Sequence, residues 1–576
     1  PADSPPAARP STRRSVGRSR APLRRRCRVA VPLRTCAGPA PDRPPPAPRK
    51  ALTMTFALLP HPIPGQTRFP TGELLACRDR LARRVRARVG PGGLLRSPCE
   101  SRVLESALAL RLLTAEEAAP QDCRRLADYL GATLDSSPPD DVQYAIGRAA
   151  LGCGAPDGGP AAWALHSLDH FTVDRKRLMF RTILAELGHA DFPAAPPVAF
   201  DAGGQQSWLQ LEMTALKVMA AFGTDRPQLV TERDWAALAP AVRPGAAWEG
   251  NHLARLLGLL ALRKHPGHRE AVRRALPDVT AALRPDGGMP FIAGMDVFAT
   301  ATAGLALTLA GYAGPLVRVM TGALAARQNP DGGFGFHPGV AQSDVDDTSY
   351  AIEFLRAAAP AEQHRTVASA ESYLLAQRNP DGGFPTFVQG TPSEVAMTAA
   401  AVNALAPNPA HRHVVERGVR FIAAHQQPDG SFERSWSRNA TNAVFRAVLA
   451  CDTDRTGGGA AQGNAACRQR AVRHLVDARN GDGGWGHQHG DASDPISTAY
   501  AVIALSRSEQ HRGTLRDALG YLVRHQRPDG GYTSRPDQAG PRPLLYDVPA
   551  LADVCVLLGL AHATAVPAVP VTTARG

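Results

Sequence analysis

The sequence predicts an all-α protein with two α/α-barrel domains built from helix-pair repeats. A turn of the type Pro-Asp-Gly-Gly recurs, apolar helical patterns flank each copy, and no strand pattern lies between them. Pro presets φ, Asp can bond the backbone ahead of it and Gly accepts positive φ, so each copy suits a chain reversal. Repeat intervals of 45 to 53 residues indicate repeated supersecondary units. The turns centre on Asp286, Asp331, Asp381, Asp429, Asp482 and Asp529.

Each turn is expected to join an outer helix to an inner one. Before most turns an apolar pattern ends in Gln or Arg, and after each comes a short aromatic loop and a second, more apolar helix. The wide apolar faces of the second helices predict an inner ring, with the first helices outside it. The helices expected before the turns include 322–328, 372–378 and 520–526, and those expected after them include 348–358 and 497–505.

These patterns divide the chain into five segments. Residues 1–53 are basic, rich in Pro and Arg and without apolar periodicity, so we expect disorder there. The first Met is Met54, where we expect the natural start. The remaining segments are 54–89, with a helix near 71–88 that packs on the C-terminal barrel; 90–309, a first α-barrel domain with helices including 214–223 and 253–263; 310–562, a second α-barrel domain; and 563–576, a frayed tail.

Charge and hydropathy exclude two classes of function. Of the net charge of +13, residues 1–50 hold +11, so the remaining 526 residues carry only +2. A body so nearly neutral has no electrostatic footprint for DNA or RNA. The richest apolar run, 256–262, is far shorter than the roughly 18 residues that cross a bilayer. The nine cysteines are never spaced as CxxC, so we expect a soluble protein of the reducing cytoplasm without disulfides or structural zinc.

An acidic cluster, Asp344-Val345-Asp346-Asp347, opens one inner helix. A single acid there is explained as a helix cap favoured by the helix dipole. Three carboxylates within four residues raise one another's pKa, and desolvation acts in the same direction. We therefore expect one neutral carboxylic acid that is ready to donate a proton. Other inner helices also open on acids, which line the same cavity if the helix starts converge on one mouth: Asp296, Glu394 and Asp494.

The run Asp344-Val345-Asp346-Asp347-Thr348 resembles the DXDD motif of class II terpene cyclases, and the recurring turns resemble the QW-type repeats shared with squalene–hopene cyclases. The segments 429–436, 482–486 and 497–502 are also similar to cyclase segments, and the likeness spans about residues 70–560. The resemblance implies a γ-type and a β-type barrel with the substrate between them. It also implies that Asp346 protonates a terminal alkene while Asp344 and Asp347 tune and orient it. A general base or water then ends the cyclisation.

The resemblance implies a linear prenyl diphosphate as substrate. The class I motif DDXXD is absent, because Tyr350 and Tyr144 stand where its last acid would be, so the diphosphate is expected to survive. Geranylgeranyl diphosphate giving a copalyl-type bicycle is the first expectation, and farnesyl diphosphate giving drimenyl diphosphate is the alternative. A squalene-type substrate is disfavoured, because 6 Trp, 9 Tyr and 17 Phe are few for guiding a long polyene cation. A downstream class I synthase or a phosphatase is an expected partner.

Five further residues are candidates for substrate binding: Lys217, Glu394, Trp436, Arg542 and Tyr546. Lys217 sits mid-helix and either meets the diphosphate or extends its ammonium to solvent. Arg542 and Tyr546 belong where the last inner helix should start and are candidates for the diphosphate site or the pocket wall. Trp436 either offers a π face to a cation or is a core or turn aromatic. The resemblance implies Mg²⁺ as the ion that helps bind the diphosphate, although the acidic diphosphate-side motif of plant homologues has no clear copy in this sequence.

The segment WEGNHLAR contains Glu249, Asn251 and His252. These residues are either structural or supply the terminating base or a magnesium contact. Two other classes stay open. A protein prenyltransferase β-subunit requires an Asp, Cys, His zinc set, and Cys451 has no His at ligand spacing. A non-catalytic α-barrel scaffold would use the acids only as caps.

Overall fold

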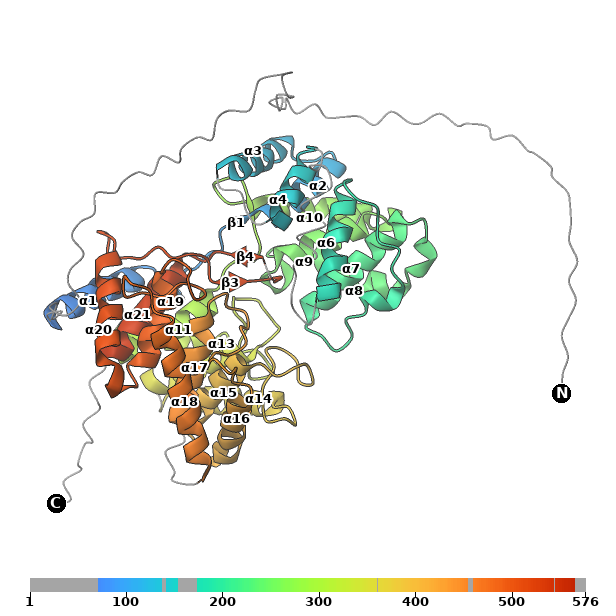
Figure 1. Ribbon diagram of the computed structural model, residues 1–576. Helices are drawn as coiled ribbons and strands as arrows, with labels where there is room; N and C mark the ends of the chain where they lie inside the picture. The colour runs from blue at the N-terminus through green and yellow to red at the C-terminus, as the bar shows by residue number, and fades with distance from the viewer. Residues whose placement is uncertain are drawn as a thin grey trace, which may run out of the picture. The chain divides into compact units, whose positions relative to one another are not determined.

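Six inner helices of the described residues close into a ring in the C-terminal part of the chain. Figure 1 shows them grouped together. Each packs against the next in chain order, and the last returns to the first. The wide apolar faces of these helices are buried against both neighbours, as the sequence pattern predicts. The ring consists of α11 (Asp296–Leu309), α13 (Val345–Ala358), α15 (Val395–Leu405), α17 (Ala440–Asp452), α19 (Pro495–Leu505) and α21 (Ala550–Thr564).

The computed structural model describes residues 71–136, 141–153, 173–359, 361–453, 459–542 and 544–564. The segment 1–53, Met54 and the tail beyond residue 564 lie outside them. The outer helices are α12 (Pro315–Ala325), α14 (His364–Gln377), α16 (Arg412–Ala424), α18 (Gly459–Asp477), α20 (Arg512–His525) and α1 (Thr71–Ala87), which contacts α20 and α21. The described helices include none that is both long enough and apolar enough to span a bilayer.

The remaining helices precede the ring in the sequence. Contacts run from α2 to α4, α6, α7 and α9 and back to α2. The α-helices are α2 (Val103–Ala115), α3 (Pro120–Ser136), α4 (Asp141–Ala150), α6 (Val173–Glu186), α7 (Ser207–Gly223), α8 (Glu232–Leu238), α9 (His252–Leu262) and α10 (Arg269–Ala281). Short 3-10 turns are η1 (Pro197–Phe200), η2 (Pro227–Leu229), η3 (Ala239–Val242), η4 (Trp248–Gly250), η5 (Pro266–His268), η6 (Pro409–His411) and η7 (Glu509–His511).

Two details differ from the sequence analysis. Helix α11 packs between α13 and α21 and completes the ring, so 296–309 belongs with the second barrel rather than with 90–309. The reason is that six inner helices are needed for closure. Four strands of two residues are also present: β1 (Ser101–Arg102) pairs antiparallel with β2 (Met289–Pro290), and β3 (Gln538–Ala539) with β4 (Leu545–Tyr546).

The recurring turn is held by its own aspartate. The Asp331 carboxylate accepts the Gly333 N–H at 2.9 Å and the Ser343 hydroxyl at 2.8 Å, just before the inner helix begins. Gly332 has φ +88°, and a Cβ there would lie 2.6 Å from a backbone oxygen. Thr348 then accepts the Phe334 N–H at 2.9 Å. Because the turns at 381 and 482 repeat these bonds, each turn fixes where its inner helix starts.

The contact between α11 and α13 gives a stability prediction. A Cβ on Gly304 would lie 2.3 Å from the Phe354 ring, which is fully buried. We expect Gly304→Ala to lower the free energy of unfolding by about 1–3 kcal/mol through overpacking. Gly322 on α12 is the matched control, because its added Cβ meets nothing within 4 Å and removing a helical Gly gains about 0.5–1 kcal/mol. Denaturant unfolding of both variants tests this, and equal stabilities would contradict it.

Candidate active site

The starts of α11 and α13 border a cavity that we call the acid pocket. Residues from α7, from the start of α9 and from loops and short strands along the rest of the chain complete its wall, and seven of its fifteen lining residues are aromatic. The wall consists of Trp208, Asn251, Phe291, Ile292, Met295, Phe298, Phe336, Asp344, Asp346, Asp347, Thr386, Phe387, Trp436, Gln538 and Tyr546. The three aspartates, Trp436 and Tyr546 that the sequence singles out therefore meet in one place.

The three aspartates have different surroundings. Asp344 is the N-cap of α13, and its carboxylate accepts the Asp347 N–H at 2.8 Å. Asp344 and Asp347 are only 4% and 3% exposed. The Asp346 side chain is 24% exposed, so it reaches free space more than the other two. Its carboxylate receives a two-pronged ion pair from Arg446 of α17, with Nη1–Oδ1 at 2.6 Å and Nη2–Oδ2 at 3.2 Å.

The surroundings raise the pKa of two of the three aspartates. Burial raises the pKa of Asp344 to about 6. Burial, with the charge and hydrogen bond of Asp344, raises the pKa of Asp347 well above its ordinary value. Asp344 and Asp347 are therefore the members of the cluster whose surroundings favour the protonated form, while Asp346 is the member that pairs with Arg446. Arg446 was missed from the sequence, although an Arg in the apolar run NAVFRAVLA is itself a signal.

A second cavity, which we call the cation pocket, adjoins the acid pocket. The two share the wall residues Trp208, Thr386, Phe387 and Trp436. The rings of Trp208, Phe387 and Trp436 lie edge to face, with centroids 5.6 to 6.4 Å apart. The indole of Trp436 donates to the Thr386 hydroxyl at 2.9 Å. An apolar chain that runs between the two pockets would thus pass aromatic faces, which can stabilise a cation.

Three cations line the cation pocket: Arg175, Lys176 and Arg542. Lys176 is only 8% exposed, and within the described residues it has no ion-pair partner. Burial and the charges of Arg542 and Arg175 lower its pKa to about 7. Burial also lowers the pKa of both arginines. Buried cations that repel one another indicate a site for a multiply charged anion.

Arg542 and Glu394, two of the candidate substrate-binding residues, both lie on this wall. Their side chains are 3.6 Å apart, and the Arg542 guanidinium lies over the Trp436 ring at 5.6 Å. The Glu394 carboxylate accepts the hydroxyls of Thr386 and Ser435. Tyr546 lies in the acid pocket instead, where its ring packs on Phe291 at a centroid distance of 5.0 Å. Burial raises its pKa, so its hydroxyl stays neutral.

Lys217 does not reach either pocket, which corrects its prediction as a diphosphate ligand. Its ammonium is 2.7 Å from the Asp234 carboxylate, in the capping box that begins α8. The side chain is 17% exposed and is already neutralised by this ion pair. The sequence could not separate Lys217 from Lys176, because both are rare lysines in helical runs.

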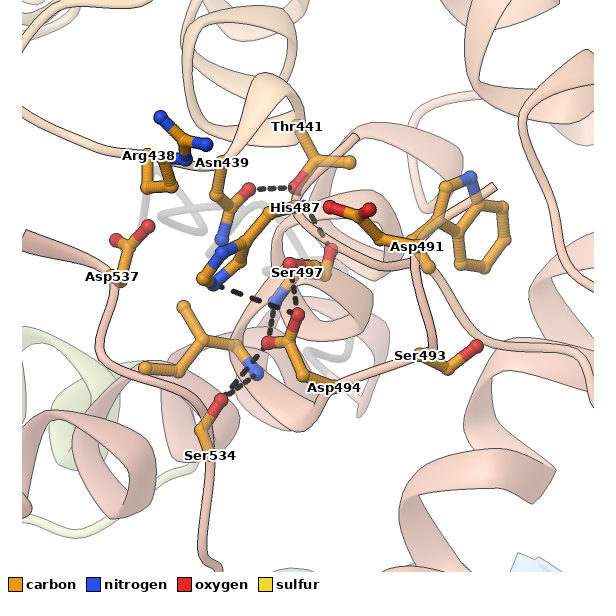
Figure 2. Close-up of polar contacts among 12 residues, drawn as sticks. Arg438, Asn439, Thr441, His487, Asp491, Ser493, Asp494, Ser497, Ser534 and Asp537 are labelled. Atoms are coloured by element: carbon orange, nitrogen blue, oxygen red, sulfur yellow. Dashed lines mark hydrogen bonds and ion pairs between the residues drawn. The ribbon is translucent and has the colours of Figure 1, made fainter. Parts of the chain in front are cut away.

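Two other helix-opening acids do not line the acid pocket. Asp494 caps α19, where it accepts the Ser497 N–H at 2.9 Å and the Ser534 hydroxyl at 2.9 Å. Figure 2 shows it in a separate buried cluster, with His487 3.9 Å away and Asp537 nearby. Asp296 accepts the backbone and hydroxyl of Ser97. The capping interpretation applies to Asp494, whereas Asp296 is the first residue of α11 and holds the distant Ser97 segment instead.

The WEGNHLAR segment contacts the loop before the aspartates and contributes one residue to the acid pocket. Glu249 accepts the N–H groups of Ala341 and Gln342 at 2.9 and 3.0 Å, which pins the loop before the aspartates. Asn251 caps α9 and lines the acid pocket. His252 is buried, and desolvation lowers its pKa to about 3, so it is a poor base.

The chain is similar in sequence and in fold to several known proteins. The family model "Prenyltransferase alpha-alpha toroid domain" matches residues 348–540. The chain is 63% identical over 521 residues to a drimenyl diphosphate synthase of Streptantibioticus cattleyicolor, covering 88% of this chain and 98% of that protein. It is 60% identical over 523 residues to a drimenyl diphosphate synthase of Streptomyces showdoensis, with the same two coverages. The solved ent-copalyl diphosphate synthase of Streptomyces platensis shares the fold, with TM-score 0.53, 18% identity, and 85% and 99% coverage.

The fold and these matches define a terpene cyclase with an α/α toroid. The chain belongs to the class II terpene cyclases, as the resemblance of its acidic run implies. It is a cyclase of prenyl diphosphates and hence an isomerase. The alternatives of a protein prenyltransferase subunit and a non-catalytic scaffold are thereby set aside.

Proposed function

We propose that the protein converts farnesyl diphosphate to drimenyl diphosphate, with the diphosphate retained. The observation that carries this is the 60–63% identity, over nearly their whole length, to two drimenyl diphosphate synthases. The likeness to the copalyl enzyme is one of fold, so the expectation of geranylgeranyl diphosphate gives way to its alternative. Separate incubations with the two diphosphates and Mg²⁺, followed by phosphatase and mass spectrometry, test this. A product from geranylgeranyl diphosphate alone would overturn the choice of substrate.

The two pockets suit the two ends of this substrate. The diphosphate would lie against Arg175, Lys176 and Arg542, and the terminal alkene would reach the acid pocket past the aromatic wall. Asp346 is the proposed proton donor, because it is the most exposed of the three aspartates. Its O–H bond breaks as a C–H bond forms on the alkene, two ring-closing C–C bonds follow, and loss of a proton gives an isomer of the substrate. Asp344 and Asp347 position Asp346 through the start of α13.

Mg²⁺ is proposed as a companion of the diphosphate. The described residues contain no group of three or more His, Cys, Asp or Glu side chains that could form a metal cage. Mg²⁺ commonly binds through one or two carboxylates together with substrate phosphates. The cation pocket wall carries two carboxyl groups, Glu212 and Glu394. Burial raises the pKa of Glu212 to about 8, so Glu394 is the one that fits that role. When bound, the ion would neutralise diphosphate charge. We also propose a cytoplasmic enzyme, since the described cysteines are all free thiols, and a class I synthase or phosphatase as the downstream consumer.

Lys176 gives a pH prediction for this substrate. In the free enzyme its pKa is lowered to about 7, so it loses its charge above pH 7. A bound diphosphate would raise that pKa, so binding takes up a proton at higher pH. We therefore expect KM to rise above pH 7, by up to about tenfold per pH unit, and to be flat on the acid side. Steady-state assays across this range measure it.

The control is Lys176→Arg, which stays charged and is expected to flatten the rise. Lys217→Arg alters a lysine of the same domain outside both pockets and should leave the wild-type profile intact. A rise that persists unchanged in Lys176→Arg would assign the pH dependence to the substrate instead.

A further inference from the structure

Glu353 carries a carboxyl group that the mechanism above does not use. It lies seven residues after Asp346 on α13, two helical turns deeper along the same face. Glu353 is half-buried, so the residue keeps some accessible surface. Within the described residues its carboxyl has no hydrogen-bond or ion-pair partner, which is unusual for a partly buried acid.

Arg446 links Glu353 to Asp346. Its guanidinium binds Asp346 and lies over the Tyr350 ring at 5.0 Å, one turn along from Asp346 toward Glu353. It is also the strongest charge acting on Glu353. The Arg446 Nε is buried with no partner among the described residues, so the guanidinium can make a further bond. Asn403 of α15 donates to the Arg446 backbone at 3.4 Å, and its own Oδ1 is also unpartnered. Polar groups on α13, α15 and α17 therefore extend from Asp346 along the ring of inner helices.

The charges of Asp346, Glu353 and Arg446 do not balance without a proton. Two carboxylates against one guanidinium carry a net charge of −1, and an unbalanced charge is costly in a low-dielectric interior. One proton shared between Asp346 and Glu353 makes the group neutral. With the proton on Glu353, Asp346 pairs with Arg446 as observed; with it on Asp346, Arg446 can pair with Glu353.

We propose that Glu353 is a proton-relay residue, which stores the proton in the substrate-free enzyme and supplies it to Asp346 as Arg446 moves from Asp346 to Glu353. This inference rests on the proposed function of Asp346. The Glu353 O–H bond breaks and an Asp346 O–H bond forms, with intervening water carrying the proton over the two helical turns between them. Solvent protonates Glu353 again after each turnover. Burial raises the pKa of Glu353 to about 7, consistent with a stored proton at neutral pH.

The charged groups that act on Glu353 are Arg446 of α17 and, on α13 itself, Asp346 and Arg356. Helix α15, which packs against α13, carries no titratable side chain. The other helices packed against α13 carry Asp296 on α11, Arg318 on α12, and His364, Arg365, Glu371 and Tyr373 on α14.

Kinetics of Glu353→Gln give the first test. We expect kcat to fall about 10- to 100-fold with KM unchanged, since Glu353 touches no substrate. Without the stored proton, Asp346 must be protonated against Arg446, so activity should keep rising as the pH falls below 6. Glu353→Asp should restore part of kcat. Glu362→Gln, on an exposed turn, is the matched control. A Glu353→Gln enzyme with the wild-type kcat and pH profile would overturn the proposal.

Infrared difference spectroscopy of the substrate-free protein gives a test that needs no activity. Titration of wild type should show a protonated carboxyl lost near pH 7, and Glu353→Gln should lack that signal. In Asp346→Asn the signal should move to lower pH, because Arg446 is then available to Glu353. An unmoved signal would overturn the relay. If these shifts appear but no diphosphate is cyclised, the proposed function is wrong, while the coupling between the Asp346 and Glu353 carboxyl groups is still established.

Discussion

Replacement of Asp346 by Asn is expected to lower kcat by about 10³-fold, because the amide keeps the shape of the carboxyl but has no acidic proton for the alkene. Its carbonyl oxygen can still accept a hydrogen bond from Arg446, so the fold should persist. Product formation from farnesyl diphosphate, measured after phosphatase treatment, gives kcat, and KM should change little. The size of the effect reflects the weak basicity of an unactivated alkene, which needs an undissociated acid in a pocket without water.

Asp347→Asn is the matched comparison within the same helix turn. Its carboxyl is already neutral by virtue of its raised pKa, and the Asp344 contact at its backbone N–H remains. We expect a loss of only about tenfold, as for a group that positions the donor. A larger loss in Asp347→Asn than in Asp346→Asn would assign proton donation to Asp347, the more strongly protonated carboxyl of the substrate-free enzyme.

The repeat made the all-α toroid predictable from sequence, because each turn encodes its own hydrogen bonds. Asp331, Ser343 and Thr348 have counterparts at nearly fixed spacing in the turns at 381 and 482, and that spacing sets the starts of α13, α15 and α19. Closure was harder to predict, because it depends on contacts between helices far apart in the chain. Helix α11 meets α21, some 240 residues later, and no local pattern shows that pairing.

The parts of the candidate site formed by residues adjacent in the sequence were predictable, and the parts formed by residues far apart in the sequence were not. Asp344, Asp346 and Asp347 are adjacent, so their mutual effect on pKa could be anticipated. Which of them is neutral depends on Arg446, which lies 100 residues away and selects Asp346 for an ion pair. Lys176 was similarly hidden, because its burial beside Arg542 brings together positions 366 residues apart.

The double variant Arg175→Met/Lys176→Met is expected to lose about 10³-fold in kcat/KM for farnesyl diphosphate, mostly through KM. Each charged hydrogen bond to the diphosphate contributes about 1.5–3 kcal/mol, so two together span about 10²- to 10⁴-fold. The substitutions should not unfold the protein, because Lys176 has no ion-pair partner within the described residues and methionine keeps the length of an apolar stem. Thermal unfolding of the variant checks this.

Farnesol, the same chain without its diphosphate, separates binding from chemistry in this variant. Wild type and double variant should turn it over at equally low rates, because the acid pocket is intact and no anion needs neutralising. The preference for diphosphate over alcohol should therefore collapse in the variant alone. If the variant instead loses activity on both compounds in proportion, Arg175 and Lys176 act on the shape of the cavity rather than on the anion, and the diphosphate belongs elsewhere along the wall.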